Sequence, residues 1–256
     1  MKTAVRPKKS LGQHFLNDEN IARKVVFSLQ TSVVPVLEVG PGMGVLTKHL
    51  LDIPGKECYF IETDQESIDY LIEKYPEHQQ WFIHADFLKY NLRVLFPGHF
   101  EIIGNFPYNI SSQILFKVLD HRQQVTQVVG MIQKEVAERL AAGPGSKTYG
   151  ILSVLLQAFY RIEYLFTVNE TVFIPPPRVK SAVIRLTRNE TKKLDCDEAM
   201  FFRVVKTAFN QRRKTLRNSL KGFYIDYEKH DLVHLAGKRA EELGVEEFVR
   251  LTNIAI

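Results

Sequence analysis

The segment Asn105-Phe106-Pro107-Tyr108 places an amide, a proline and an aromatic ring directly after the strand-like run 102–104. The exocyclic amine of a nucleobase is a poor nucleophile, because its lone pair is delocalised into the ring. The Asn105 side-chain oxygen and the Pro107 carbonyl would accept its hydrogens and direct the lone pair towards a methyl donor. Proline stiffens the segment and the Tyr108 ring offers a base a stacking face. Asn105, Pro107 and Tyr108 are therefore candidate catalytic residues, and a plain turn is the alternative.

A glycine-rich loop lies earlier in the chain, where "VLEVGPGMG" ends an apolar run with Gly40, Gly42 and Gly44. A backbone without side chains lets a nucleoside-sized ligand lie against the edge of a sheet. The third glycine of the dinucleotide fingerprint GxGxxG is replaced by Val45, so the pyrophosphate-binding turn is not reproduced. This spacing disfavours nicotinamide and flavin cofactors.

Two acidic residues end the next two apolar runs. Glu62, at the end of the second strand, is suited to accept hydrogen bonds from ribose hydroxyls, and Asp86 from an adenine amino group. Ribose and adenine without pyrophosphate indicate S-adenosylmethionine, and methyl transfer from it needs no metal. Each of these features alone is more typical of an ordinary turn or loop, but together, at three successive strand ends, they predict one cofactor site that includes Gly40 and Gly42.

The elements that would hold these residues alternate between apolar β-rich runs and helical patterns, which is typical of an α/β fold with a mostly parallel sheet. A short proline-rich link joins the last two runs, so an antiparallel pair at one edge is expected. Seven strands are predicted at 34–40, 57–62, 81–86, 100–105, 127–133, 160–167 and 182–187, and helices at 45–51, 66–74, 112–119 and 134–141. Ser111 or Ser112 is expected to cap the third helix. After Arg188 the pattern becomes polar and then helical, which predicts domains 1–190 and 191–256.

Composition limits the class of protein. The 256 residues are 45% apolar, enough for a full core, and the two cysteines, Cys58 and Cys196, are too far apart to indicate a disulfide framework or a zinc cluster. His230 and His234 are read as ordinary helix residues. No run has the length of a signal peptide or a membrane span, which predicts a cytoplasmic protein without a membrane partner.

Positive charge is concentrated near the C-terminus. The net charge is +5, yet residues 203–221 alone hold seven basic and no acidic residues. Val205, Phe209, Leu216 and Leu220 recur at helical spacing, which predicts one helix with a packed face and a cationic face. We expect the cationic face, including Arg213 and Arg217, to contact phosphates of a nucleic acid, although a solvated surface helix is the alternative.

The motifs together resemble the ribosomal RNA adenine dimethyltransferases. "NFPYNIS" is similar to the (D/N/S)-P-P-Y signature of methyltransferases that act on exocyclic amines. The likeness is closest to the small-subunit enzymes of the KsgA/RsmA type. It extends over "KKSLGQHFLND" at 8–18, "LEVGPGMGVLT" at 37–47, "IETD" at 61–64, "HADFL" at 84–88, "MIQKEVAERLAAGPGSKTYGILSV" at 131–154, "FIPPPRVKSAVIRL" at 173–186 and "FNQRRKTLRNSLK" at 209–221.

The resemblance implies a seven-stranded Rossmann-like class I methyltransferase domain followed by a small all-helical RNA-binding domain. It implies a monomer that uses S-adenosylmethionine to dimethylate two adjacent adenosines in the hairpin near the 3′ end of small-subunit rRNA. Cofactor contacts are expected from His14, Leu16, Gly40, Glu62, Asp86 and Asn105. Tyr108 and Phe173 would provide the two stacking faces for the target adenine.

Two positions depart from the family pattern, in which Asn is more usual than His14 and Leu or Ile more usual than Phe106. A main-chain contact at His14 would make the first change harmless. Two other functions stay open on the residues. One is a large-subunit rRNA adenine methyltransferase of the antibiotic-resistance type, and the other is a ribosome-assembly or transcription factor that binds nucleic acid without catalysis.

Overall fold

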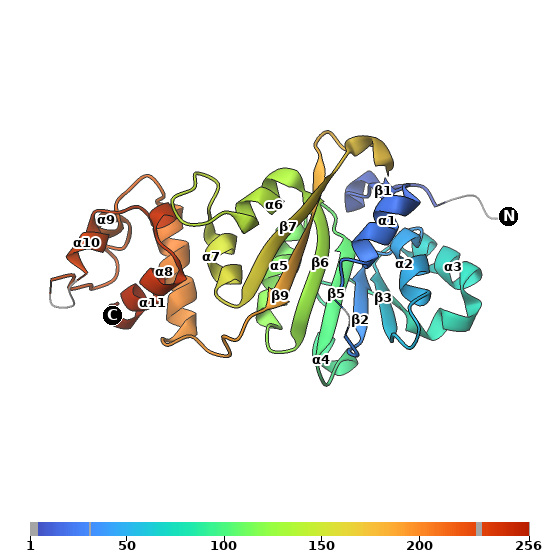
Figure 1. Cartoon of the computed structure of the whole chain (residues 1–256), viewed down its shortest axis with the longest axis horizontal. Coiled ribbons are helices and arrows are strands. Elements are labelled where there is room, and N and C mark those ends of the chain that lie inside the picture. Colours follow the sequence, from blue (N-terminus) through green and yellow to red (C-terminus); the bar gives the residue numbers. More distant parts are fainter. Residues whose placement is uncertain (1–4, 31, 229–231, 256) are drawn as a thin grey trace. The chain divides into compact units, whose positions relative to one another are not determined.

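A computed structural model describes residues 5–30, 32–228 and 232–255 (Figure 1). Contacts within the chain divide it into two units. We call Met1–Ala137 with Glu163–Arg188 the sheet unit, and Glu138–Ile162 with Asn189–Ile256 the helical unit. The expected domains 1–190 and 191–256 differ from these units in the placement of residues 138–162, and that division stays a prediction.

The sheet unit contains the expected seven-stranded mixed sheet, which confirms the α/β fold class. The strand order is β4-β3-β2-β5-β6-β9-β7, in which β4, β3, β2, β5 and β6 are parallel and β9 is antiparallel to β6. The strands are β2 (Val36–Val39), β3 (Cys58–Glu62), β4 (Phe82–His84), β5 (Phe100–Asn105), β6 (Val125–Gln133), β7 (Tyr160–Val168) and β9 (Ser181–Arg188). Because β3, β2 and β5 are parallel neighbours, their carboxyl ends meet at one edge of the sheet.

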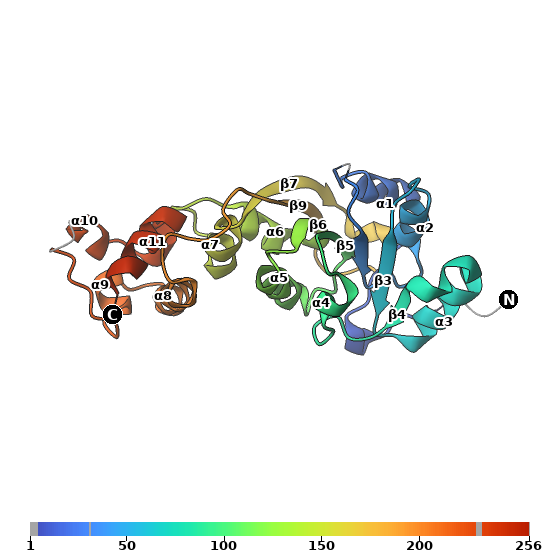
Figure 2. The ribbon, with the colours of Figure 1, turned by 90° about the horizontal axis from the view of Figure 1, so that it is seen from below.

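Helices cover both faces of this sheet. Figure 2 shows α1 and α2 on one face and α5 on the other. The side chain of Asp18 starts α1 by accepting hydrogen bonds from the N–H groups of Asn20 and Ile21. The helices of this part are α1 (Glu19–Val26), α2 (Val45–Leu51), α3 (Gln65–Lys74), α4 (Leu92–Leu95), α5 (Ser111–Asp120) and α6 (Lys134–Ala141).

The expected serine cap of α5 is wrong. Its N-cap residue is Ile110, which makes no side-chain capping bond. Ser111 lies inside the helix, and its hydroxyl donates instead to the Tyr108 carbonyl over 3.3 Å. The serine therefore closes the turn that follows Pro107 rather than capping the helix.

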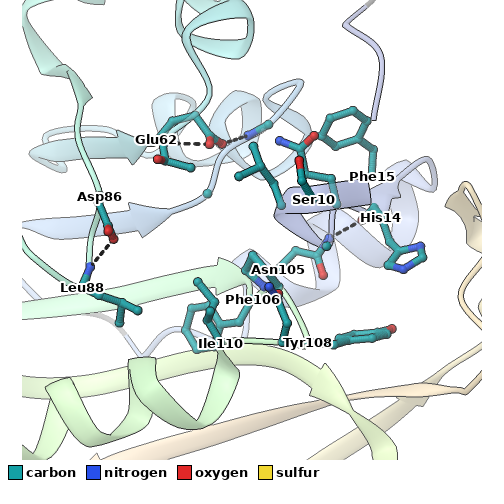
Figure 3. Close-up of a pocket in the computed structure, with 18 residues that line it drawn as sticks. Ser10, His14, Phe15, Glu62, Asp86, Leu88, Asn105, Phe106, Tyr108 and Ile110 are labelled. Carbon is teal, nitrogen blue, oxygen red and sulfur yellow. Dashed lines mark hydrogen bonds between the residues drawn. The ribbon is translucent and has the colours of Figure 1, made fainter. Parts of the chain in front are cut away.

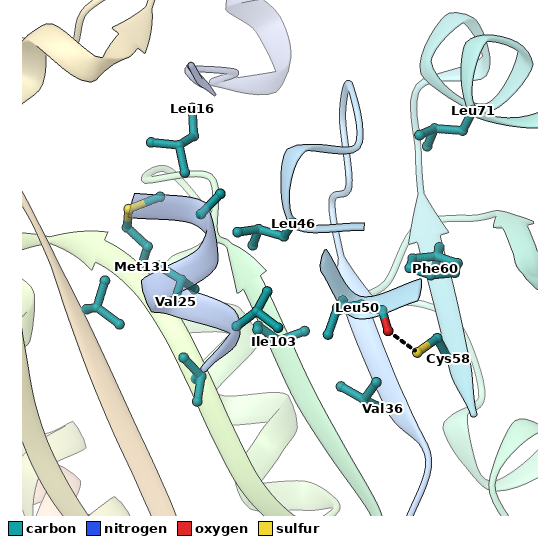
Figure 4. Packing of buried hydrophobic residues seen from close by; sticks show 14 of the residues in the cluster. Leu16, Val25, Val36, Leu46, Leu50, Cys58, Phe60, Leu71, Ile103 and Met131 are labelled. Carbon is teal, nitrogen blue, oxygen red and sulfur yellow. Dashed lines mark hydrogen bonds between the residues drawn. The ribbon is translucent and has the colours of Figure 1, made fainter. Parts of the chain in front are cut away.

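The core between the sheet and α1 and α2 is apolar (Figure 4). Val25 of α1 and Leu46 and Leu50 of α2 pack with Val36 of β2 and Phe60 of β3. Burying each such side chain stabilises the fold by roughly 1.5–3 kcal/mol. This packing fixes the strand ends from which the glycine loop and Glu62 emerge.

A second, two-stranded sheet was not predicted. β1 (Phe15–Leu16) pairs antiparallel with β8 (Phe173–Ile174), so that Phe15 lies opposite Ile174 and Leu16 opposite Phe173. Lys8, near a short 3-10 turn at Lys9–Leu11, donates to the Asp64 carboxylate over 2.5 Å. The N-terminal segment is therefore held at both ends.

The helical unit contains α7 (Ile151–Gln157), α8 (Glu198–Asn210), α9 (Leu216–Ser219), α10 (Val233–Ala236) and α11 (Val245–Ile254). The single helix predicted over 203–221 is wrong, because α8 ends at Asn210 and a turn separates it from α9. The four apolar residues that suggested it, Val205, Phe209, Leu216 and Leu220, are all buried, as expected. Arg212 lies in this turn, and its guanidinium bonds the Lys147 carbonyl and the Glu241 carboxylate, which helps to hold the turn in place.

Candidate active site

The carboxyl edge of the parallel strands borders a cavity of about 230 Å³ (Figure 3). The N-terminal segment 10–15, the glycine loop and the segment 105–110 form its walls. Of the residues predicted to bind the cofactor or the adenine, the structure brings together His14, Gly40, Gly42, Glu62, Asp86, Asn105, Pro107 and Tyr108 around this cavity.

The glycine loop needs its glycines for two different reasons. Gly40, Gly42 and Gly44 have φ values of 71°, 55° and 78°, a region that L side chains rarely adopt. A Cβ atom at Gly42 would lie 2.8 Å from the Phe15 ring, whereas one at Gly40 would meet nothing within 4 Å. Gly42 thus makes room for the N-terminal segment, and Gly40 leaves open space beside the cavity.

Backbone N–H groups hold the Glu62 carboxylate. Its Oε1 accepts from the N–H groups of Thr63 and Asp64 at 2.8 and 3.0 Å, and its Oε2 from Gly42 at 3.1 Å. Because an ionised carboxylate has about four acceptor positions, Oε2 keeps capacity for a ligand hydroxyl. Burial raises the pKa of Glu62, and the three backbone hydrogen bonds oppose that rise.

Glu38 lies beneath the loop and was not singled out in the sequence. It is only 1% exposed, and its Oε2 accepts from the Thr47 hydroxyl over 2.6 Å. Burial raises the pKa of Glu38 to about 8, so its carboxyl is mostly protonated at neutral pH. In the sequence, Glu38 stands in the run "VLEVG" like an ordinary strand residue. No sequence signal indicated that its side chain is buried.

Asp86 follows β4, and its Oδ1 accepts from the Leu88 N–H over 2.9 Å. The Leu88 side chain also lines the cavity, as does that of Ile110. Figure 3 shows the two apolar side chains on the Asp86 side of the cavity. A planar ring would have apolar surface against its faces here and a carboxylate at its edge.

The Asn105 amide is held in one orientation. Its Nδ2 donates to the main-chain carbonyl of His14 over 2.8 Å. That contact uses the donor end of the amide, so Oδ1 is the end that remains for a ligand. The partner atom of His14 is its main-chain carbonyl oxygen, so this contact does not depend on the His14 side chain.

The Tyr108 ring is fixed from two sides. Its hydroxyl hydrogen-bonds the Ser181 hydroxyl at 2.5 Å, and the His14 imidazole stacks on it with centroids 5.5 Å apart. His14 Nδ1 in turn lies 2.7 Å from the Pro175 carbonyl oxygen. Burial raises the pKa of the Tyr108 phenol, so it is neutral at physiological pH.

Phe106 packs on a pair of glycines that face each other across β5 and β6. Gly104 lies opposite Gly130, and a Cβ atom at either one would come within 2.9 or 2.6 Å of the Phe106 ring. The paired glycines thus provide the space that this large side chain needs. The buried ring anchors the segment that carries Asn105 and Pro107.

The structure does not bring the other predicted site residues to this cavity. Leu16 lines a small neighbouring cavity with Gly40 and Asn105. Phe173 is 1% exposed and packs in the core beside β1, so neither face of its ring is open to a base. Arg213 and Arg217 lie in the helical unit, where both are exposed.

Among the residues that the structure describes, no three His, Cys, Asp or Glu side chains gather in an arrangement that could hold a metal ion. His230 lies outside the described residues. Every helix described is too short or too polar to cross a bilayer.

Comparisons with known proteins agree with this architecture. Residues 4–256 match the family described as Ribosomal RNA adenine dimethylase. The chain is 58% identical over 252 residues to the Ribosomal RNA small subunit methyltransferase A of Parabacteroides distasonis, covering 98% of this chain and 94% of that protein. The relative from Cytophaga hutchinsonii, which carries the same name, is also 58% identical over 98% of this chain and 97% of its own.

Solved structures show the same fold. A dimethyladenosine transferase from Plasmodium falciparum superposes with a TM-score of 0.78 at 25% identity, covering 94% of this chain and 99% of that one. The 23S rRNA methyltransferase ErmE superposes with a TM-score of 0.72 at 24% identity, covering 93% and 98% of the two chains. On its sequence and its fold, this chain belongs to the ribosomal RNA adenine dimethylase family.

Proposed function

We propose that the protein dimethylates two adjacent adenosines in the hairpin near the 3′ end of small-subunit rRNA, with S-adenosylmethionine as methyl donor. The observation that carries the proposal is the fixed Asn105 amide, whose donor end is bound to the His14 carbonyl. Its Oδ1 is then an acceptor at the edge of the cavity, where a nucleobase amine needs one. The 58% identity to small-subunit methyltransferases supports this substrate over the large subunit.

The residues around the cavity fit the proposed methyl donor. Gly40 leaves open space where a side chain would stand, Glu62 keeps acceptor capacity for ribose hydroxyls, and Asp86 offers a carboxylate to an adenine amino group. S-adenosylmethionine, when bound, supplies an electrophilic methyl group on a sulfonium. We also assign His14, Gly42 and Asn105 to the binding site of the methyl donor. Leu16, which lines the small neighbouring cavity, is assigned to this binding site as well.

On the substrate side, we propose two hydrogen-bond acceptors for the reacting amine. Asn105 Oδ1 and the Pro107 carbonyl would bind its two hydrogens and hold the nitrogen in an orientation suited to attack. Tyr108 would stack on the base, since His14 and Ser181 already hold its ring in place. The amine loses a proton after transfer, and no side chain in the cavity has to take it before attack.

The exposed cations of the helical unit are proposed to bind RNA. Arg213 and Arg217 are exposed, whereas Arg212 is bound to Lys147 and Glu241. Exposed guanidinium groups are suited to phosphate oxygens, and each contact adds salt-dependent affinity. We expect the protein to act as a monomer in the cytoplasm.

Labelled S-adenosylmethionine and unmethylated small and large ribosomal subunits test the proposal. We expect label only in the small subunit, on two adjacent adenosines that mass spectrometry maps near the 3′ end of its rRNA. Label on large-subunit rRNA would identify the protein as the other type of adenine methyltransferase. Binding to small subunits without transfer would favour an assembly factor instead.

A further inference from the structure

A second cavity lies in the helical unit, and Arg217 is the one residue assigned so far that lines it. It has a volume of about 510 Å³ and is formed by the end of α9 and the loop that follows, residues 217 and 220–228. Leu220 is buried beneath it. We call these residues the loop cavity.

The loop cavity carries an aromatic ring that the protein leaves uncovered. Tyr224 is 72% exposed, while its neighbours Phe223 and Tyr227 are held from behind. The Arg203 guanidinium lies 5.7 Å from the Phe223 ring centroid, and the Arg217 guanidinium 5.8 Å from that of Tyr227. Two rings are thus fixed by cation–π contacts, and the third presents its surface to solvent.

Charged groups of both signs line the loop cavity. Arg217 of α9 and Lys221, just after α9, are exposed. Asp226 Oδ1 accepts from the Glu228 N–H over 3.2 Å, which shapes the loop. Cations beside an open aromatic ring are the arrangement that binds single-stranded nucleic acid, with the base on the ring and the backbone on the cations.

Tyr227 also lines the loop cavity. It is 7% exposed, and its hydroxyl has no hydrogen-bond partner among the described residues. A buried hydroxyl without a partner costs free energy, which a hydrogen bond from the edge of a base would recover after a small shift of the loop. An aliphatic ligand would leave that hydroxyl unpaired, so a nucleobase fits better.

We propose that the loop cavity binds one unstacked nucleobase of single-stranded RNA, with Tyr224 as the stacking platform and Arg217 and Lys221 on the flanking phosphates. The source of that RNA rests on the proposed function, since the bound base would belong to the rRNA substrate. The site is separate in sequence from the adenine site at Tyr108. It would hold a base that is not methylated.

A tryptophan reporter tests stacking directly. The chain has one tryptophan, Trp81, so the double variant Trp81→Phe/Tyr224→Trp carries its only indole in the loop cavity. A single-stranded hexaribonucleotide should quench this fluorescence saturably, and the same oligonucleotide with abasic sites should bind without quenching. The matched control is Trp81→Phe/Phe27→Trp, because Phe27 is 73% exposed and lies in the sheet unit. Its fluorescence should not respond.

Binding to whole subunits gives the second measurement. Tyr224→Ala should weaken the affinity for unmethylated small ribosomal subunits roughly 5- to 100-fold, while Tyr224→Phe stays near the original affinity. Phe27→Ala should leave it unchanged. Equal affinities for Tyr224→Ala and Phe27→Ala, or equal quenching at the two reporter positions, would overturn the proposal. If the unaltered protein transfers no methyl group to small subunits, the proposed function fails, and the quenching result still decides whether the loop cavity binds a base.

Discussion

The cavity of the sheet unit and the cationic turn of the helical unit handle polar groups in opposite ways. Around the glycine loop that borders the cavity, Glu38 and Glu62 are 1% and 5% exposed, and backbone N–H groups or a hydroxyl hold their oxygens. In the turn, Arg213 and Lys214 are exposed to solvent. The first region fixes its groups before a ligand arrives, whereas the second presents charge that a ligand must organise.

This difference separates two kinds of functional effect. Fixed groups lower the barrier of a reaction because they need no reorganisation when the substrate binds. Exposed charges raise the rate and strength of association, and salt screens them. Changes in the cavity should therefore act on turnover or stability, and changes in the turn on affinity and its salt dependence.

The largest effect is expected at Asn105. Asn105→Ala removes the acceptor proposed for the reacting amine, so methyl transfer should fall by at least about 1,000-fold in kcat while RNA affinity changes little. Single-turnover assays on unmethylated small subunits measure the rate, and a filter-binding assay measures the affinity. Unchanged turnover would contradict the mechanism, and a matching loss of affinity would remove the contrast between the two regions.

Glu38 should make stability depend on pH. The folded protein keeps the Glu38 proton up to a pKa of about 8, whereas the unfolded chain releases it near 4.5. The unfolding free energy should therefore decrease as pH rises from about 5 to 8, by roughly 3–5 kcal/mol from this group. Urea denaturation at several pH values measures the slope. In Glu38→Gln, the unfolding free energy should depend less on pH. An equally steep slope in that variant would show that the pH dependence does not come from Glu38.

The glycine pair beneath Phe106 offers a smaller structural test. Gly130→Ala places a Cβ atom 2.6 Å from the Phe106 ring, so the variant should lose about 1–3 kcal/mol of unfolding free energy and shift the Asn105 segment. Phe106→Leu in the same chain should recover part of the lost stability and turnover, because the smaller side chain relieves the clash. Thermal denaturation and methyl transfer together measure both. Additive losses in the double variant would show that the two residues do not share this space.

The smallest effect is expected at two exposed cations, Arg213 in the turn and Arg217 in α9. Arg213→Glu with Arg217→Glu should weaken RNA binding by roughly tenfold and lower the slope of log affinity against log salt by about 1.5, at 0.7–0.9 per phosphate contact. Arg212→Glu is the matched comparison, since Arg212 holds the turn and its loss should lower the thermal midpoint. If the salt slope of the double variant is unaltered, neither Arg213 nor Arg217 contacts a phosphate.

The sequence was sufficient for the sheet and for most of the cavity. Parallel strands that follow each other in sequence end at one edge, so Gly40, Glu62 and Asp86 had to lie near one another once the strands were identified. The apolar runs were long enough to show those strands. The structure confirms the predicted fold class and the seven predicted strands.

Other features depend on contacts that no local pattern encodes. β1 and β8 have two residues each, too short for any periodicity. The His14 imidazole meets Pro175 across 161 positions, and Tyr108 meets Ser181 across 73. The apolar spacing from Phe209 to Leu216 is the same in one helix as in two helices joined by a turn. The contacts that distinguish the two come from distant residues, such as those of Arg212 with Lys147 and Glu241 and of the Leu216 N–H with the Lys238 carbonyl.

The pairing of β1 with β8 also sets an order of assembly. The N-terminal segment that covers the cavity is synthesised first, but Phe15 and Leu16 find their partners only after Ile174 has been made. The parallel strands β2 to β5 can form before that point, and the closing of a loop this long is slow. A growing chain that stops before residue 173 would have the glycine loop, Glu62 and Asn105, but the N-terminal segment over them would lack its strand partner. We therefore expect the affinity for the methyl donor to arise late in synthesis.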